Sequence, residues 1–284
     1  MMRQQIGKAL SRAQKQIERL DAQLLLAHVL DVTREHLLAH DERRLSLLQS
    51  LRFSRLVQKR KQHTPLAYLV GQKAFYGLDF FVNKNVLVPR PETEDLVEYV
   101  LQKIENLKGE KMLLVDIGTG SGCIPISIVK THKHSNIQTL AIDVSKTALK
   151  IAKKNAQKHG VNIQFLKGNL LKPILKQSDH LSISPFDHVF VTANLPYVPA
   201  ADYKQQPSIQ KEPPLALLAG SDGMDLYREF IPQLLKLKDL TSASVSCIME
   251  MDPSQIVPLS ALFKNKPEVI KDLSGRERFL FVTL

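Results

Sequence analysis

The chain has 284 residues, of which 44% are hydrophobic and 24% charged, proportions typical of a folded globular protein large enough for two domains. No apolar run reaches the roughly 18 residues that a membrane-spanning helix needs, and the first residues hold no secretory signal, so we expect a cytoplasmic protein. Two cysteines, Cys123 and Cys247, are too few for a disulfide framework, and no residue pattern predicts a metal site.

The charge of the chain is uneven. Lys and Arg number 39 against 28 Asp and Glu, which gives a net charge of +11. Residues 1–75 alone carry 14 Lys or Arg against 6 Asp or Glu. Such a surface attracts nucleic acid or an acidic protein face over long distances. A solvated helical surface without a specific partner explains the same pattern equally well.

Residues 1–72 are predicted to form a small all-helical domain. Asp21 can cap a helix over AQLLLAHVL, and Thr33 can cap a short helix that follows. The segment SLLQSLRFSRLVQKRKQ has helical periodicity, with an apolar face predicted for Leu47, Leu48, Leu51, Leu56 and Val57.

Residues 73–90 are predicted to form a β-hairpin linker. AFYGLDFFV and NVLV are rich in β-forming residues and flank Asn83-Lys84-Asn85, where we place the turn. Thr93 can then cap the first helix of a larger domain over residues 91–284.

Strands and helices alternate from residue 112 onward. The segments MLLVD, IQTLAID, VNIQFLKG, DHVFVTAN and SVSCIMEM are predicted strands, separated by helices. Apolar strands between helices are typical of a mostly parallel sheet covered on both faces. The last segment, RERFLFVTL, can add an antiparallel hairpin strand, so we expect an α/β domain.

A glycine-rich turn follows the first of these strands. Gly118, Gly120 and Gly122 alternate with Thr119 and Ser121, and they let the backbone turn tightly beside a ligand. Asp143 ends the next strand, where a carboxylate can accept hydrogen bonds from both ribose hydroxyls of a nucleoside. A turn carboxylate that caps the helix beginning near Ser145 is the alternative interpretation of Asp143.

The tetrapeptide Asn194-Leu195-Pro196-Tyr197 closes the fourth strand, at the edge of the sheet where ligands bind. The Asn194 side-chain oxygen and the Leu195 carbonyl can both accept from an NH₂ group, whose nitrogen is a weak nucleophile. Pro196 stiffens the turn, and Tyr197 can stack on a planar group. Such positioning converts a bimolecular reaction into an effectively unimolecular one. The four residues resemble a signature of enzymes that methylate planar nitrogen groups.

The chain resembles the release factor glutamine methyltransferases, the PrmC/HemK family, over nearly its whole length. The resemblance lies in these stretches: DAQLLLAHVL, PLAYLVGQKAFYGLDF, VLVPRPETEDLV, VDIGTGSGCIPISI, EPPLALLAGSDGMDLYREFI and GRERFLF. It implies a class I, Rossmann-like methyltransferase domain that binds S-adenosylmethionine. In that class Asn169 and Leu170 are expected beside the adenine. It also implies that residues 1–72 recognise the substrate.

The implied substrate is the glutamine of the Gly-Gly-Gln motif in class I peptide chain release factors, methylated at N5. Within VLVPRPETE, Arg90 and Glu92 are expected to bind the backbone of that motif, or else to form a structural ion pair. The resemblance leads us to expect a monomer that requires no nucleic acid. The stretch from Glu250 to Asp252 departs from the family pattern, and we assign it no catalytic role.

Two alternatives stay open. Leu195 stands where the family usually has proline, and Asn-Leu-Pro-Tyr is the form that resembles rRNA adenine dimethyltransferases. An N6-adenine methyltransferase acting on RNA or DNA is therefore the first alternative. The second is a non-catalytic nucleotide-binding module in which residues 194–197 form only a turn.

Overall fold

The computed structural model describes residues 4–107, 109–132, 137–176 and 185–284. Contacts between residues divide the chain into two units. The first comprises Met1–Gln72 with Pro207–Lys211, and the second comprises Lys73–Gln206 with Glu212–Leu284. Within the described residues no helix is both long and apolar enough to cross a bilayer.

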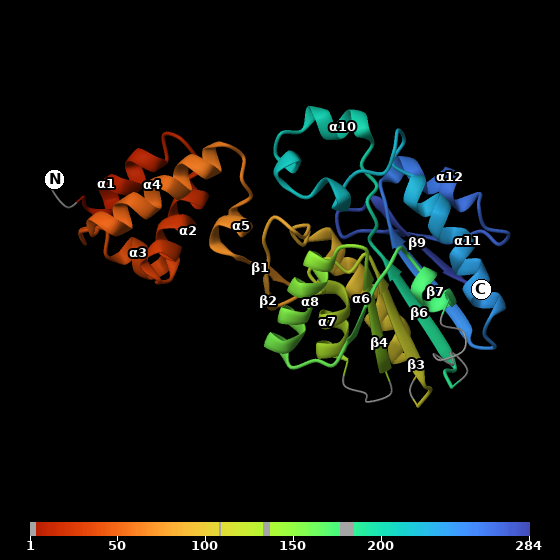
Figure 1. Cartoon of the computed structure of the whole chain (residues 1–284). Helices are drawn as coiled ribbons and strands as arrows, with labels where there is room; N and C mark the ends of the chain where they lie inside the picture. The colour runs from red at the N-terminus through yellow and green to blue at the C-terminus, as the bar shows by residue number, and fades with distance from the viewer. Residues whose placement is uncertain (1–3, 108, 133–136, 177–184) are drawn as a thin grey trace. The chain divides into compact units, whose positions relative to one another are not determined.

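The first unit is a set of helices around its own apolar core (Figure 1). Its helices are α1 (Ile6–Ala13), α2 (Arg19–Leu30), α3 (Arg34–Ala39), α4 (Leu47–Lys61) and α5 (Leu66–Val70). Leu25 and Leu26 of α2 are fully buried, because this helix contacts α1, α3, α4 and α5.

Two predictions about helix starts have different outcomes. Thr33 caps α3 as predicted, and its side chain accepts a hydrogen bond from the His36 amide. The prediction that Asp21 caps α2 is wrong, because that helix begins two residues earlier, at Arg19. The Asp21 carboxylate instead accepts from the Arg60 guanidinium at 2.5 Å and so ties α2 to α4.

The predicted apolar face of α4 is also wrong. Phe53 and Val57 are the buried residues of this helix, whereas Leu47, Leu48 and Leu51 are exposed. At 3.6 residues per turn, Leu48 lies on the side of the helix opposite Val57, whereas Leu56 is next to Val57 and packs against the core. The large number of leucines in this segment suggested a single apolar face. The helix in fact carries apolar residues on more than one side, and only one of these sides is buried.

The hairpin has its turn earlier than the sequence predicted. Strands β1 (Gln72–Phe75) and β2 (Leu78–Phe81) pair around Tyr76 and Gly77, which both have positive φ angles. A two-residue turn of this kind matches the twist of the strands. Asn83 forms its own local turn by accepting from the Asn85 amide, and residues 86–89 are not a strand.

The second unit contains a seven-stranded sheet of order β5-β4-β3-β6-β7-β9-β8. Its strands are β3 (Met112–Ile117), β4 (Ile137–Asp143), β5 (Gln164–Lys167), β6 (His188–Ala193), β7 (Ser244–Glu250), β8 (Glu268–Lys271) and β9 (Glu277–Thr283). The first five are parallel, and β9 pairs antiparallel with both β7 and β8. The α/β fold with a terminal antiparallel hairpin is therefore as predicted.

Helices cover both faces of this sheet (Figure 1). One layer holds α6 (Glu92–Glu105), α7 (Cys123–Thr131) and α8 (Lys146–His159), and the other holds α9 (Lys172–Lys176), α11 (Asp225–Asp239) and α12 (Ile256–Ser260). A short α10 (Ala200–Gln205) and the 3₁₀ turns Ile209–Lys211, Pro214–Ala216 and Pro253–Gln255 complete the elements. Strand β3 shows the alternation, since Leu114 packs in the first layer and Val115 in the second.

The order in which the chain adds strands to the sheet changes side between β3 and β6. The chain runs from β3 outward through β4 to β5, then returns to β6 on the other side of β3. The carboxyl ends of these neighbouring strands form a crevice where ligands bind in open α/β sheets. The topology therefore places the ends of β3, β4 and β6 at one edge.

Candidate active site

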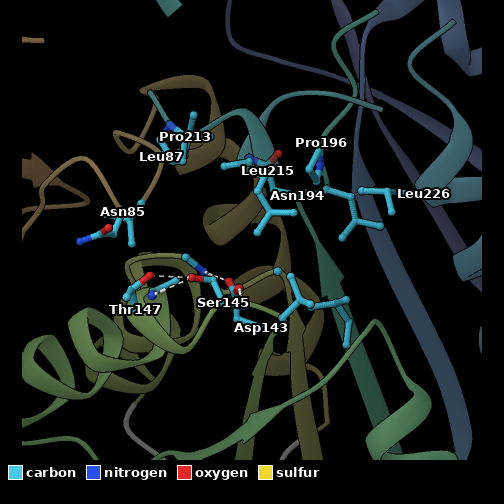
Figure 2. Close-up of a pocket in the computed structure, with 18 of the residues that line it drawn as sticks. Asn85, Leu87, Asp143, Ser145, Thr147, Asn194, Pro196, Pro213, Leu215 and Leu226 are labelled. Carbon is cyan, nitrogen blue, oxygen red and sulfur yellow. Dashed lines mark hydrogen bonds between the residues drawn. The ribbon is translucent and has the colours of Figure 1, made fainter. Parts of the chain in front are cut away.

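A pocket of about 570 Å³ opens at this edge of the sheet, a size typical of small-molecule sites. Figure 2 shows Leu87 and Pro213 on one side of the pocket and Asp143 and Ser145 on the opposite side. Of the predicted site residues, those that line it are Gly118, Gly120, Asp143, Asn169, Leu170, Asn194, Leu195 and Pro196. Segments from four strand ends thus meet around one cavity.

The glycine turn is held from behind by the neighbouring strand. The amides of Gly118 and Thr119 both donate to the Ile142 carbonyl of β4, at 2.9 and 3.0 Å. Gly118 has φ +70°, and a Cβ there would lie 3.3 Å from the Leu195 side chain. Glycine at this position lets the turn approach the tetrapeptide closely.

Three predicted cofactor residues support the turn without lining the pocket. The side chains of Thr119 and Ser121 are buried, and Gly122 has φ +80° where a Cβ would lie 2.9 Å from Ile126. Asp116, at the start of the turn, is buried and accepts from the Thr192 hydroxyl at 2.7 Å. Burial raises the pKa of Asp116 to about 7.

Asp143 lines the pocket and also holds the backbone at the start of α8. One carboxylate oxygen accepts from the Gly120 amide at 2.9 Å, and the other accepts from the Ser145 amide at 2.8 Å. A carboxylate has about four acceptor positions, so two remain for other donors. Burial raises the pKa of Asp143, while its two backbone hydrogen bonds oppose that rise.

The next wall of the pocket combines apolar side chains with an amide. The Asn169 Nδ2 donates to Glu229 at 2.9 Å, which leaves its side-chain oxygen as a free acceptor beside the pocket. Leu170 is buried and has a positive φ of 53°. Val144 also lines the pocket and is 47% exposed, although the sequence analysis assigned it no role. Its position directly after Asp143 was the available signal.

The tetrapeptide at the end of β6 presents acceptors toward the pocket. The Asn194 Nδ2 donates to the Thr93 hydroxyl at 3.1 Å and to Glu250 Oε2 at 2.8 Å, so the NH₂ end of this side chain faces these two oxygens. Its Oδ1 is therefore the group left to accept from a ligand. Thr93 lies inside the first turn of α6, so the prediction that it caps this helix is wrong.

Tyr197 does not line the pocket. Its hydroxyl donates to Glu250 Oε1 at 3.4 Å, so Glu250 contacts two residues of the tetrapeptide. Glu250 is 1% exposed, and burial raises its pKa to about 7. From the sequence we assigned Glu250 no catalytic role. The available signal was its position at the end of β7, the strand next to β6.

Arg90 and Glu92 have different surroundings in the structure. The Arg90 guanidinium forms an ion pair with Glu212 at 2.5 Å, whereas Glu92 is exposed at the start of α6. Glu212 is buried and also accepts from the Val88 amide at 2.9 Å. Arg90 therefore forms a structural ion pair, but with Glu212 and not with Glu92 as the sequence suggested.

The shape and the polar groups of the pocket fit a nucleoside. A side-chain-free turn at Gly118 and Gly120 gives room for close backbone approach, and Asp143 supplies carboxylate acceptors for ribose hydroxyls. Val144 and Leu170 offer apolar surface for a base, and the Asn169 oxygen offers an acceptor for its amino group.

Two family models match the chain. Residues 2–71 match the PrmC N-terminal domain, and residues 108–244 match a methyltransferase domain. The release factor glutamine methyltransferase of Bacillus cereus is 34% identical over 92% of this chain and 91% of its own length. That of Leptospira interrogans is 38% identical over 93% of this chain and 91% of its own length.

The chain belongs to the release factor glutamine methyltransferase family. It is therefore an S-adenosylmethionine-dependent methyltransferase, as the glycine turn and the tetrapeptide predicted.

Solved structures agree on the fold. The human METTL16 catalytic domain bound to MAT2A 3'UTR hairpin 1 has a TM-score of 0.54, with 18% identity over 85% of this chain and 83% of that chain. The N-terminal domain of human METTL16 in complex with SAH has a TM-score of 0.51, with 17% identity over 86% of this chain and 85% of that chain. At this identity the likeness concerns the fold alone.

Proposed function

We propose that the chain transfers a methyl group from S-adenosylmethionine to the side-chain amide nitrogen of the glutamine in the Gly-Gly-Gln motif of class I release factors. The observation that carries this proposal is the free Asn194 Oδ1 beside the glycine turn and Asp143 in one pocket. Membership of the release factor glutamine methyltransferase family supports the choice of substrate.

The pocket divides into two roles in this proposal. The turn at Gly118 and Gly120, with Asp143 and Asn169, holds the cofactor, and Val144 and Leu170 enclose its base. When bound, S-adenosylmethionine supplies an electrophilic methyl group on its sulfonium. Asp143 already accepts two backbone amides, so it is fixed in place before any ligand arrives.

The tetrapeptide orients the acceptor. An amide nitrogen is a weak nucleophile because its lone pair is delocalised into the carbonyl group. Asn194 Oδ1 and the Leu195 carbonyl accept from the two hydrogens of the glutamine NH₂, and this fixes the direction of its nitrogen. Pro196 lines the pocket beside them. Orientation of this kind can contribute up to roughly 7–11 kcal/mol. The nitrogen releases one proton to solvent as it gains the methyl group.

The test is a transfer assay with purified chain, S-adenosylmethionine and an intact release factor. We expect the mass of one methylene group to be added to the glutamine of the Gly-Gly-Gln motif. A release factor with Asn in place of that glutamine is the matched control and should stay unmodified. A parallel reaction with total RNA tests the adenine alternative. Methyladenine formed while the release factor stays unmodified would overturn the proposal.

A further inference from the structure

The Glu250 carboxyl group lies buried among residues of the tetrapeptide. Glu250 ends β7, next to β6 in the sheet, and is 1% exposed. Its Oε2 accepts from Asn194 Nδ2 and from the Thr93 hydroxyl, both at 2.8 Å, and its Oε1 accepts from the Tyr197 hydroxyl at 3.4 Å. A carboxylate in this place must form several hydrogen bonds to offset the cost of burial.

The backbone of Glu250 reaches the same tetrapeptide. The Tyr227 hydroxyl of α11 donates to the Glu250 carbonyl and accepts from the Leu195 amide at 3.3 Å. Tyr227 is fully buried, so both of these hydrogen bonds lie in the apolar core and are shielded from solvent. Glu250 therefore holds Asn194 and Tyr197 directly and Leu195 through Tyr227.

The charge of Glu250 decides which way Asn194 faces. The two ends of an asparagine amide have nearly the same shape, so hydrogen-bond partners determine its orientation. An ionised carboxylate only accepts, and it therefore requires the NH₂ end of Asn194. A protonated carboxyl group can also donate, and it then tolerates the oxygen end instead. In that reversed orientation Asn194 would present NH₂ to the NH₂ of the substrate.

We infer that Glu250 is a positioning residue for methyl transfer, and that its ionised carboxylate holds Asn194 with Oδ1 facing the acceptor nitrogen. This inference rests on the function proposed above, because it concerns the orientation of the glutamine amide. Glu250 acts through Asn194 and does not itself touch the substrate.

The groups around Glu250 set the pH at which the carboxylate forms. Burial raises the pKa of Glu250 to about 7, and Glu92 adds to the rise, while Arg278 and the hydrogen bonds from Thr93 and Tyr197 oppose it. Burial also raises the pKa values of the two tyrosine hydroxyls nearby, so both stay protonated donors at neutral pH. Arg278 is itself paired with Asp272 at 2.9 Å. Since the ionised form is the orienting one, kcat should fall as the pH decreases below about 7.

The test compares the wild-type chain with Glu250→Gln at saturating S-adenosylmethionine. Gln keeps the shape of the side chain, but its NH₂ group can donate to Asn194 Oδ1 and permit the reversed orientation. We expect kcat to fall about 10- to 100-fold, as when a charge-assisted hydrogen bond is lost, with KM for the release factor changed little. We also expect the fall of kcat below about pH 7 to disappear in the variant.

Two controls separate this role from a general loss of structure. Thr93→Val removes a neutral hydroxyl from the same cluster but keeps the carboxyl group, so it should lower kcat and keep a pH-dependent fall. That fall should move to higher pH, because the Thr93 hydrogen bond no longer opposes the rise of the Glu250 pKa. Calorimetry should show unchanged S-adenosylmethionine binding by Glu250→Gln, which reports on the fold of the pocket. Asp116, whose pKa is likewise about 7, is unchanged in Glu250→Gln, so a fall of kcat caused by Asp116 would persist in that variant.

Each outcome has a defined meaning. A wild-type chain that transfers no methyl group to the release factor overturns the proposed function and this inference together. A wild-type chain that methylates the release factor, but whose kcat does not change across pH 7, overturns the role of Glu250 alone. The same conclusion follows if Glu250→Gln keeps the wild-type kcat and pH profile.

Discussion

Asp143 shows how one side chain can serve both the fold and a ligand. Its two oxygens accept from the Gly120 and Ser145 amides, which joins the glycine turn to the start of α8 (Figure 2). These contacts use about half of the acceptor capacity of a carboxylate and leave the rest directed at the pocket. The residue therefore preorganises the turn to which we assign the cofactor.

Replacement of Asp143 by Ala should weaken S-adenosylmethionine binding about 10- to 150-fold, because hydrogen bonds to a charged acceptor contribute about 1.5–3 kcal/mol. Isothermal calorimetry measures the change. Asp143→Asn keeps the size of the side chain but must turn its NH₂ group toward the Gly120 or the Ser145 amide, so it should weaken binding as well. Equal affinity of the wild type and the folded Ala variant would remove Asp143 from the cofactor site.

Asn194 acts on a different step from Asp143. In the proposed function its Oδ1 orients the glutamine nitrogen, so Asn194→Ala should reduce kcat by at least about 100-fold. S-adenosylmethionine affinity should stay within a few-fold of wild type, because other residues form most of the cofactor wall. Single-turnover kinetics and calorimetry measure the two quantities. Near-normal turnover by the variant would exclude the proposed orienting role.

At the scale of elements, Glu212 joins two loops that wall the pocket. It accepts from the Val88 amide and pairs with Arg90 on one loop, and the residue after it, Pro213, lines the pocket from the other. Leu215, farther along the second loop, also lines the pocket and is 61% exposed. The ion pair therefore ties together two loops that line the pocket.

Arg90→Met should destabilise the chain by about 2–3 kcal/mol, because it leaves the Glu212 carboxylate buried without its cation. This is less than for a fully buried pair, since Arg90 is about one third exposed. The double variant Arg90→Met/Glu212→Gln should recover most of the loss, as Gln keeps an acceptor for the Val88 amide. Urea unfolding measures both. A double variant no more stable than Arg90→Met would contradict the role of the buried charge.

At the scale of the whole molecule, positive charge is concentrated in the helical unit. Residues 1–75 carry 14 of the 39 Lys and Arg residues and only 6 of the 28 acidic ones. A glutamine in a short motif offers little surface to a catalytic pocket, so selectivity requires a second contact region. We propose that the helical unit provides it through an acidic surface of the release factor.

Charge reversal on α4 tests this proposal. Arg52, Arg55 and Lys59 are exposed, so their replacement by Glu should preserve the fold. We expect KM for intact release factor to rise roughly tenfold at low salt, with a smaller effect at high salt, because exposed charges are screened. KM for a short Gly-Gly-Gln peptide should not change. Steady-state kinetics at two ionic strengths measure both.

The matched control reverses three exposed lysines of the catalytic unit, Lys150, Lys153 and Lys236. The net charge changes by the same amount, so any effect of total charge should appear in both variants. An equal rise of KM in the two variants would show that the helical unit has no special part in substrate binding.

The sequence by itself determined the features that depend on neighbouring residues. The glycine run from Gly118 to Gly122, the tetrapeptide from Asn194 and the alternation of strands and helices all follow from local composition and periodicity. The resemblance to the family added the substrate. Local patterns failed where two nearby segments could both form a turn. The hairpin turn forms at Gly77 and not at Asn83.

Only the tertiary structure decided which distant residues share the site. Glu250 bonds to Asn194 across 56 residues of sequence, and Glu212 pairs with Arg90 across 122. No periodicity connects such positions, because their contact depends on the order of strands in the sheet and on the path of a long loop. Burial then gave Glu250 its altered pKa and committed the NH₂ group of Asn194. The sequence supplied the acceptor, and the packing of β6 against β7 determined its orientation.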